Sequence, residues 1–551
     1  MRPPGPDGNM SHVAHDRNAP EATARRAPEA QRDAGTGAAH RTLSLAAVLF
    51  AVSMTFIDQT LVSIAAPRIA EDLGLTPAGI RWVVNAYLLA LAACCALGGR
   101  LAELLGHRRI MLVGTVVFLL AAALCGAVPH GDAALAWLIV CRAGQGVGAA
   151  LMFPAALAVV GMVVPAARRR RSLALFFGLS GVLTAIGPVL GGWLTTWTWR
   201  AVFWVNVPVA LAAVVLTLLA HLPDDARRGH LDGRGALLLA AGTVLSVLGL
   251  QQAGTWGWAA PATWACTLGG LLALVVFVRL ELRTRHPLLG LRVFRDRAYV
   301  ADAVVLFFAM AAFVPVFFFA SVYAQVALGS SPNEAGLYLL VFFAGFGVAA
   351  QFGGRLLDRY GARTALRLGT ALAAVGFALW AHEMTDLSLT AQWPWIVLAG
   401  AGIGLLLAPA STDAAGRAAG TARGEATGVT RTVRGYAAGL GLAVLGTVLA
   451  HTTTDRIVES LKDRGLSTAT SRELAHGLTG TPAGQGGRPP AGDAASRLPP
   501  EVLDAVRGDF AEGNRAVFYA MAAALAVAFL CAHLHPGTRR TPAPPPGAGR
   551  T

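Results

Sequence analysis

The chain is 551 residues long, with 55% hydrophobic but only 14% charged residues. Soluble domains carry roughly 25% charged residues, so this composition excludes a soluble protein and predicts one that crosses the membrane many times. The formal net charge of +14 does not indicate nucleic-acid binding, because the basic residues lie in short gaps between apolar runs. All six cysteines fall within apolar runs without metal or disulfide spacing, so we expect no metal and no cofactor.

The chain begins and ends with polar tails. Residues 1–42 are rich in Pro, Ala, Arg and Asp without an apolar period, which predicts a disordered cytoplasmic tail, and residues 536–551 form a second tail. Between them lie fourteen apolar runs of about the 20 residues that a membrane-spanning helix needs. They cover residues 43–66, 80–98, 110–128, 134–162, 172–194, 201–221, 235–253, 262–280, 299–322, 335–353, 365–382, 394–411, 427–450 and 515–535.

The distribution of arginine predicts the orientation. Every second short loop is rich in arginine, as cytoplasmic loops are, which places both termini in the cytoplasm of a multi-pass cell-membrane protein. The opposite short loops contain no Arg or Lys; they are residues 129–133, 254–261, 323–334 and 383–393. Residues 451–514 are predicted to be one long, poorly ordered outer loop, which its length exempts from the arginine rule.

Span one contains Asp58, a carboxylate well inside a span, and burial of a charge in the bilayer makes it a functional candidate. Asp58 lies eight residues from the outer end of its span, and Arg142 in span four lies equally deep (66 − 58 and 142 − 134). At 1.5 Å per residue both lie about 12 Å below the outer boundary. The two side chains are therefore expected to meet if the helices are neighbours.

This pair suggests a proton-coupling site. A nearby arginine stabilises the charged form of a carboxylate, and separating the two favours protonation. We hypothesise that Asp58 carries the proton, that Arg142 modulates its proton affinity, and that opening toward one side breaks their contact. The alternative is a permanent ion pair that only fixes the register of the helices.

The loop after span two, Gly99–Arg109, recurs after span ten as Gly354–Arg363. Duplicated halves are common in transporters, so we predict an N-terminal six-helix bundle (43–221), an inserted helix pair with its flanking loops (222–298) and a C-terminal six-helix bundle (299–535). The glycines would allow tight turns, and the acids would accept hydrogen bonds from helix N-termini or arginines, forming a cytoplasmic gate. The predicted gate residues are Gly99, Arg100, Glu103, Gly106, Arg108, Arg109, Gly354, Arg355, Asp358, Gly361 and Arg363. The alternative is that these arginines only retain the loops in the cytoplasm.

Span five is unusual because it is apolar yet rich in helix-breaking residues, which are Gly178, Gly181, Gly187, Pro188, Gly191 and Gly192. In a soluble helix each such glycine costs about 1 kcal/mol and the proline about 3. A bilayer enforces the helix, and small residues let a neighbouring helix approach closely. We predict a pliable, closely packed helix, and the alternative is purely static packing.

Together these motifs resemble the fourteen-helix drug:proton antiporters of the major facilitator superfamily. The resemblance is carried by Ile57–Pro67, Trp82–Tyr87, Gly99–Arg109, Arg142–Gly148, Gly187–Gly192 and Trp199–Pro208. It implies an all-α major facilitator fold of fourteen transmembrane helices and, from the span-five antiporter motif, export. Glu103 departs from the family's usual Asp, whereas Asp358 in the second copy keeps it.

The substrate is less well defined by the sequence. Polar residues of these motifs and phenylalanines of spans nine and ten are assigned to a substrate cavity, namely Gln59, Asn85, Tyr87, Gln145, Phe313, Phe317 and Phe346. The phenylalanines would alternatively face lipid or pack between helices. Span ten contains no acid, which disfavours a divalent cation and leaves neutral, zwitterionic or weakly charged compounds.

We therefore expect a non-enzymatic antiporter that exchanges protons for a small amphipathic organic compound, such as a drug or antibiotic, by alternating access. The partners are the substrate, protons and the lipid bilayer; no nucleic acid is expected, and no nucleotide, because a phosphate-binding loop is missing from the sequence. One alternative is an importer or facilitator of the same fold. Another is a non-transporting membrane receptor or membrane-embedded enzyme.

Overall fold

The computed structural model of the chain describes residues 19–75, 77–164, 186–220, 226, 231–284, 287–417, 422–463 and 500–536. Within these ranges the secondary structure is helical throughout, which confirms the predicted all-α class. The helices are α1 (Ala19–Leu73), α2 (Pro77–Leu105), α3 (His107–Gly126), α4 (Ala134–Val163), α6 (Ala201–Trp204), α7 (Asn206–Leu219), α8 (Gly233–Trp256), α9 (Pro261–Glu281), α10 (Arg297–Val326), α11 (Pro332–Tyr360), α12 (Ala362–Glu383), α13 (Leu389–Arg417), α14 (Ala422–Asp463) and α16 (Pro500–His533). Two short 3₁₀ helices, η1 (Leu291–Arg295) and η2 (Met384–Asp386), and a helical segment at residues 186–197 complete the described secondary structure.

The described part contains 12 helices long and apolar enough to cross a membrane, and α1 makes a thirteenth if its two parts, bent by 42° between Thr42–Asp58 and Thr60–Leu73, are taken as one span. Each matches one of the predicted spans, with α6 and α7 together forming span six. The fifth predicted span, 172–194, lies within the described residues only from 186 onward.

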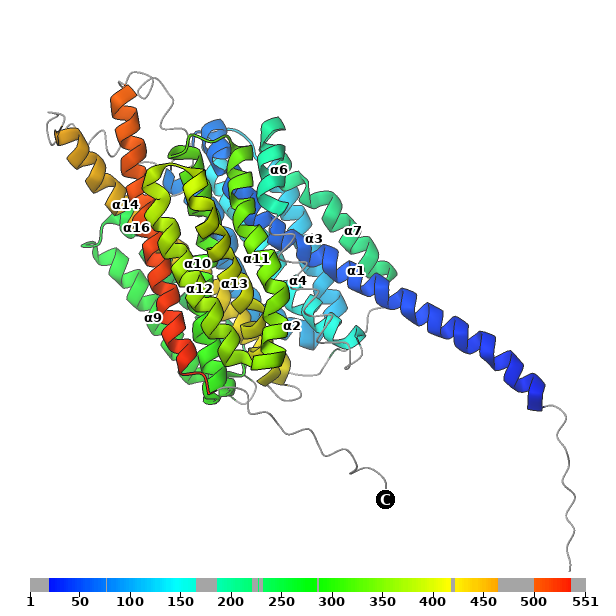
Figure 1. The fold of residues 1–551 in the computed structure, drawn as a ribbon. Coiled ribbons are helices and arrows are strands. Elements are labelled where there is room, and N and C mark those ends of the chain that lie inside the picture. Colours follow the sequence, from blue (N-terminus) through cyan, green and yellow to red (C-terminus); the bar gives the residue numbers. More distant parts are fainter. Residues whose placement is uncertain are drawn as a thin grey trace, which may run out of the picture.

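The helices form two groups that lie side by side (Figure 1). In the first, α4 packs against α1, α2 and α3, while α7 packs against α1 and α3. In the second, α13 packs against α10, α11 and α12, and α16 packs against α10, α12 and α14. The α8–α9 hairpin is attached through α8, which contacts α2 of the first group and α14 of the second.

Several helices are longer than the apolar runs that predict them. α1 begins at Ala19, within the segment predicted to be disordered, where many alanines and arginines give the chain good helix propensity. α14 continues to Asp463 and α16 begins at Pro500, so both extend into the predicted outer loop. There Ser460 donates a hydrogen bond to Asp509 (3.0 Å), which helps the two helices to support each other outside the apolar zone.

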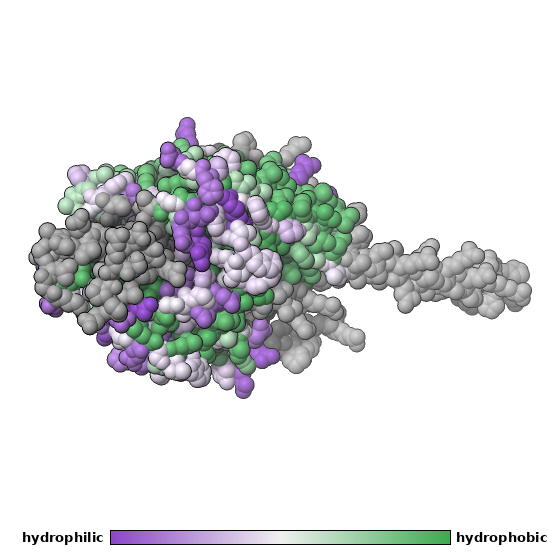
Figure 2. Space-filling model, turned by 90° about the horizontal axis from the view of Figure 1, so that it is seen from above, coloured by the Kyte–Doolittle hydropathy of each residue, from purple (hydrophilic) through white to green (hydrophobic). Residues whose placement is uncertain are grey.

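The outer surface of the bundle is apolar, as contact with lipid requires. Large hydrophobic side chains are exposed around it, for example Val140 (68%), Leu237 (70%) and Leu530 (65%). Seen from above, hydrophilic side chains gather across the middle of one end of the molecule, and hydrophobic ones surround them (Figure 2). The distribution is that of a membrane protein with polar residues at the ends of its helices.

Candidate functional site

Asp58 on α1 lies at the centre of a buried polar network. Its side chain is 0% exposed, and Oδ2 accepts a hydrogen bond of 2.5 Å from Nη1 of Arg142 on α4, whose side chain is 1% exposed. Oδ1 accepts longer hydrogen bonds from the amide groups of Gln145 (3.4 Å) and Asn206 on α7 (3.3 Å). The contact between Asp58 and Arg142 that equal depth predicts is therefore present, and two helices, α4 and α7, supply donors to this carboxylate of α1.

Arg142 is held from several sides. Its Nε donates to the backbone carbonyl of Val83 on α2 (3.2 Å), and Nη1 also donates to Oε1 of Gln145 (2.9 Å). The guanidinium carbon lies 4.6 Å from the ring centroid of Tyr87, a cation–π contact. These contacts fix the arginine so that the carboxylate meets one edge of it.

A glycine of α4 lets this helix pack closely against α3. A Cβ at Gly148 would meet the backbone nitrogen of Phe118 at 2.6 Å and the backbone oxygen of Gly114 at 2.7 Å, so α3 and α4 touch backbone to backbone. With α4 pressed against its neighbours, Arg142 and Gln145 face the centre of the first helix group.

Next to this network is a small cavity of about 10 Å³ between the two helix groups, about the size needed for one water molecule. It is lined by Ser63, Val84, Tyr87, Leu88, Arg142, Val314, Phe318 and Leu442. Arg142 is thus both the partner of Asp58 and part of the cavity wall. The cavity therefore gives the buried pair an immediate neighbour space in which a solvent molecule or ligand atom can lie.

Only some of the residues assigned to a substrate cavity lie at the cavity in the structure. Tyr87 lines the cavity, whereas Gln145 points into the Asp58 network instead. The Asn85 amide donates to the side chain of Gln251 on α8, and its own oxygen is buried without a hydrogen-bond partner among the described residues. The side chain of Gln59 lies outside the described part.

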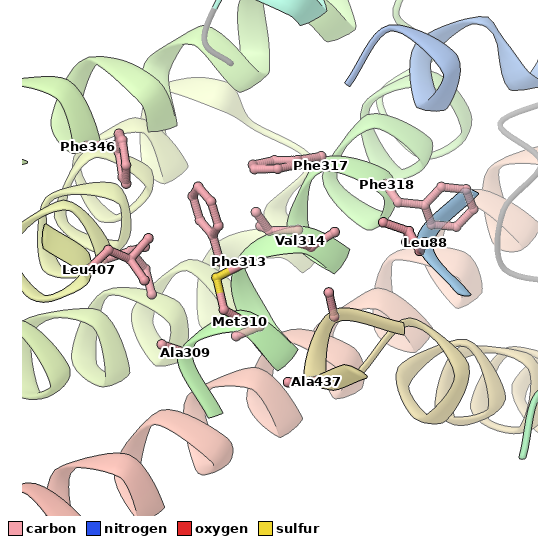
Figure 3. Packing of buried hydrophobic residues seen from close by; sticks show 14 of the residues in the cluster. Leu88, Ala309, Met310, Phe313, Val314, Phe317, Phe318, Phe346, Leu407 and Ala437 are labelled. Carbon is pink, nitrogen blue, oxygen red and sulfur yellow. The ribbon is translucent and has the colours of Figure 1, made fainter. Parts of the chain in front are cut away.

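The three phenylalanines assigned to the substrate cavity, Phe313, Phe317 and Phe346, pack on one another and are not among the residues that line this cavity. Phe313 lies between Phe346, stacked at a centroid distance of 5.3 Å, and Phe317 at 4.9 Å (Figure 3). From α10 it is Val314 and Phe318 that reach the cavity wall, with Phe318 near Leu88 of α2. The three predicted phenylalanines therefore serve here as packing between helices, because they lie on the faces of α10 and α11 that meet each other.

The glycines of the predicted antiporter motif lie at a contact between the two helix groups. A Cβ at Gly191 would meet Leu61 of α1 at 3.1 Å, and one at Gly192 would meet the Cα of Asn333 on α11 at 2.7 Å. On the other side, a Cβ at Gly336 of α11 would meet the carbonyl oxygen of Pro188 at 2.5 Å. The segment 186–197 is thus in backbone contact with both α1 and α11, and Gly187 also packs on α1. Gly178 and Gly181 lie outside the described residues.

The predicted gate motifs occupy matching positions in the two groups. Gly106 separates α2 from α3 with φ of +99°, and Gly361 separates α11 from α12 with φ of +83°. Both φ values favour glycine. The expectation that Gly99 also forms part of the turn is wrong, because α2 continues to Leu105 and Gly99, like Gly354 in α11, is inside a helix.

Five charged gate residues, Arg100, Glu103, Arg108, Arg355 and Arg363, make contacts within their own helix group. Nη1 of Arg100 donates to Glu103 (2.8 Å), and Nη2 of Arg108 donates to the carbonyl of Leu218 on α7 (3.2 Å). Nη2 of Arg363 donates to the carbonyl of His533 (3.0 Å). The guanidinium carbon of Arg355 lies 5.5 Å from the ring centroid of Phe352. The remaining charged residues of the two motifs are Arg109 and Asp358.

A second buried cluster, which sequence reasoning missed, joins the ends of α10, α13 and α16. Nε2 of His535 lies 3.5 Å from Asp302 and 3.3 Å from Asp413, and all three offer metal-ligand atoms within 4.8 Å of one another. Nε of Arg417 donates to Asp413 (2.7 Å) and lies 3.8 Å from Asp302. A protein cation therefore already balances these carboxylates.

The charge of His535 depends on this cluster. Burial lowers the pKa of His535, but hydrogen bonds and charge interactions with Asp302 and Asp413 outweigh it and raise the pKa to about 9. A histidine whose pKa is raised on folding stabilises the fold below its unfolded pKa, and this contribution is lost as the pH rises through about 9. When the pH is raised from about 7 to about 10, we expect the apparent Tm of the wild-type protein to fall by more than that of His535→Gln. Thermal scans at both pH values check this, and equal pH dependence would contradict it.

The family model described as Major Facilitator Superfamily matches residues 48–449. The tetracenomycin C resistance and export protein of Streptomyces glaucescens is 31% identical over 519 residues, which are 92% of this chain and 95% of that protein. The puromycin resistance protein pur8 of Streptomyces alboniger is 34% identical over 449 residues, 80% of this chain and 87% of that one. A solved bacterial homolog of the human lysosomal transporter Spinster, inward-facing and occupied, is similar in fold, with a TM-score of 0.57 at 17% identity over 90% of this chain and 97% of that chain.

Proposed function

Because the chain belongs to the Major Facilitator Superfamily, we propose that it is a proton-coupled antiporter that exports small amphipathic organic compounds by alternating access. Family membership makes it a multi-span membrane transporter and not an enzyme, and it confirms the resemblance seen in the motifs. Efflux as the direction follows from its similarity to resistance and export proteins. We place both termini in the cytoplasm, as the arginine distribution predicts.

One observation carries the coupling proposal, which is the buried pair of Asp58 and Arg142 beside the central cavity. A carboxylate in a bilayer needs either a cation or a proton, and here the cation belongs to another helix. When α1 and α4 move apart, the distance of 2.5 Å between Oδ2 of Asp58 and Nη1 of Arg142 grows, and protonation of Asp58 becomes favourable. Uptake of the proton on one side and its release on the other then couple the proton gradient to movement of the substrate.

The contacts of segment 186–197 with α1 and α11 support the structural part of the cycle. Gly192 lies against the backbone of Asn333, and Gly336 lies against the backbone of Pro188, so the two helix groups are in close backbone contact here. In the proposed orientation this joint lies toward the outer side. Its separation would open the central cavity outward while the two helix groups rock.

We expect purified protein in liposomes with an imposed pH gradient to move protons when a transported compound is added. Tetracenomycin C and puromycin are suitable probes, because similar proteins carry these names. A pH-sensitive dye inside the vesicles reports the proton flux, and a protonophore should abolish accumulation of the probe. Equilibration of the probe that neither the pH gradient nor the protonophore changes would favour a facilitator, and gradient-driven movement in the same direction as the protons would favour an importer.

A further inference from the structure

Two arginines of α14, Arg431 and Arg434, lie inside the helix bundle and are not used in the proton-coupling site. At this point α14 crosses α2 closely, because a Cβ at Gly435 would lie 3.2 Å from the Cβ of Ala92. α14 contacts α10, α13 and α16 of its own group and also α2 and α4 of the other. The two side chains are therefore next to the boundary between the helix groups.

Arg431 faces the first helix group. Its guanidinium carbon lies 3.7 Å from the ring centroid of Phe153 on α4 and 6.0 Å from that of Phe56 on α1. These two rings form an edge-to-face pair at 5.9 Å. One face of the guanidinium is thus covered by an aromatic ring, an arrangement that leaves the N–H edge of an arginine available.

Arg434 faces the second helix group. Its Nη1 donates a weak hydrogen bond to the hydroxyl of Ser411 on α13 (3.3 Å). Its Nε is buried and has no hydrogen-bond partner among the described residues. An unsatisfied buried donor on a charged group is costly, and it lies on the edge with which arginine binds carboxylates in a bidentate manner.

The charges of these arginines are not balanced by the described protein. Neither of them is within ion-pair distance of a described carboxylate, whereas Arg142 is paired with Asp58. Residues three apart on a helix are neighbours, so the two positive charges also repel each other. Two unpaired cations in a bilayer-spanning bundle are expensive, which marks the position as a functional candidate with an anion as the missing partner.

We infer that Arg431 and Arg434 bind the acidic group of an aromatic organic anion, while its ring packs beside Phe153 and Phe56. The inference rests on the proposed export function and specifies its substrate class. Phe153 is 11 residues beyond Arg142 on α4, so the site lies about 16 Å along that helix from the proton-coupling pair. In the proposed orientation this is the cytoplasmic side, from which an exported compound enters.

The test uses two fluorescent probes that differ in one charge, coumarin-3-carboxylate and its neutral ethyl ester. Their binding to the purified full-length protein is measured by fluorescence anisotropy. The wild-type protein should bind the carboxylate more tightly than the ester. Arg431→Gln and Arg434→Gln should each weaken carboxylate binding by about tenfold, the scale of one lost charge-assisted hydrogen bond, without changing the affinity for the ester.

Three controls make the result decisive. Unchanged ester binding shows that a variant is folded, and Arg434→Lys should keep part of the preference because the charge remains. Arg456→Gln, on the same helix but in a partly exposed pair with Glu512, should behave as wild type. Equal affinity of the wild-type protein for both probes, no binding of the carboxylate, or equal weakening of both probes by the variants would overturn the inference.

The outcome can be separated from that of the proposed function. One outcome is that puromycin or tetracenomycin C still drives proton movement in vesicles while the protein binds the carboxylate no more tightly than the ester. In that case the anion site is wrong and the antiporter proposal stands. If the arginines bind the carboxylate selectively but no compound moves protons, the site stands and the antiporter proposal fails.

Discussion

Vesicles containing Asp58→Asn are expected to lose proton-driven transport down to the level of vesicles without the protein. Asparagine keeps the shape of the side chain but cannot carry a proton, so the coupling step has no carrier. The remaining contacts with Gln145 and Asn206 can still form, which keeps the helices in register. Transport of puromycin or tetracenomycin C under an imposed pH gradient is the measurement. Retained gradient-driven transport at normal expression would remove Asp58 from the mechanism and leave the pair a purely structural role.

Loss of activity must be distinguished from loss of folding. Removing one partner of a buried ion pair costs about 3–5 kcal/mol, because the other charge stays buried without compensation. Asp58→Asn/Arg142→Gln removes both charges and should recover expression and thermal stability but not proton coupling. Glu71→Gln is a matched control on the same helix, since Glu71 is 70% exposed and pairs with Arg68 on the surface.

The second large effect is expected from Gly192→Ala. The new methyl group would overlap the backbone of Asn333 on α11, which cannot move aside as a flexible side chain can. Overpacking of this kind costs about 1–3 kcal/mol, and here only the conformation in which segment 186–197 contacts α11 bears the cost. Since about 1.4 kcal/mol is a factor of ten in an equilibrium, we expect transport to fall by roughly tenfold while the protein stays folded.

The facing position provides an independent test of the same contact. Gly336→Ala introduces a methyl group against the carbonyl of Pro188 and should have a similar effect on transport. Gly347→Ala, also on α11, is the matched control, because a Cβ there meets nothing within 4 Å. Normal transport by both Gly192→Ala and Gly336→Ala would show that the joint between the helix groups does not need to close as tightly as it does in this structure.

The fold could be predicted from the sequence because the signal for a membrane span is local. A run of about 20 apolar residues must become a helix in lipid, whatever the rest of the chain does. Helix ends were less predictable, since the extensions of α1, α14 and α16 beyond the apolar runs depend on helix propensity and on contacts between helices. The placement of Gly99 in a turn failed for the same reason, as α2 does not stop where its apolar run does.

The site was predictable only in part. Equal depth in adjacent spans was enough to bring Asp58 and Arg142 together, because a helix has a fixed rise per residue. The cluster of Asp302, Asp413 and His535 has no such signal. Its members come from three helix ends far apart in the sequence and meet only through the packing of α10, α13 and α16.

Arg431 and Arg434 were missed for a different reason. They lie inside a predicted span, but apart from Arg142, which equal depth matches to Asp58, arginine is interpreted only as a marker of cytoplasmic loops. Asn206 is likewise part of the motif Trp199–Pro208 and is the first residue of α7, yet only the structure shows that its amide donates to Asp58. Both cases need knowledge of which way a side chain points, and that is set by how each helix is rotated in the bundle.

The 42° bend in α1 lies immediately after Asp58, between the parts Thr42–Asp58 and Thr60–Leu73. Beyond the bend, residues 60–73 form a rigid lever of about 20 Å, at about 1.5 Å per residue. A change of only 10° at its pivot would sweep the far end through about 3.5 Å, enough to separate a hydrogen-bonded pair of groups. If Asp58 carries the proton as we propose, gain or loss of one hydrogen ion at this bend would be amplified into a displacement at the membrane surface.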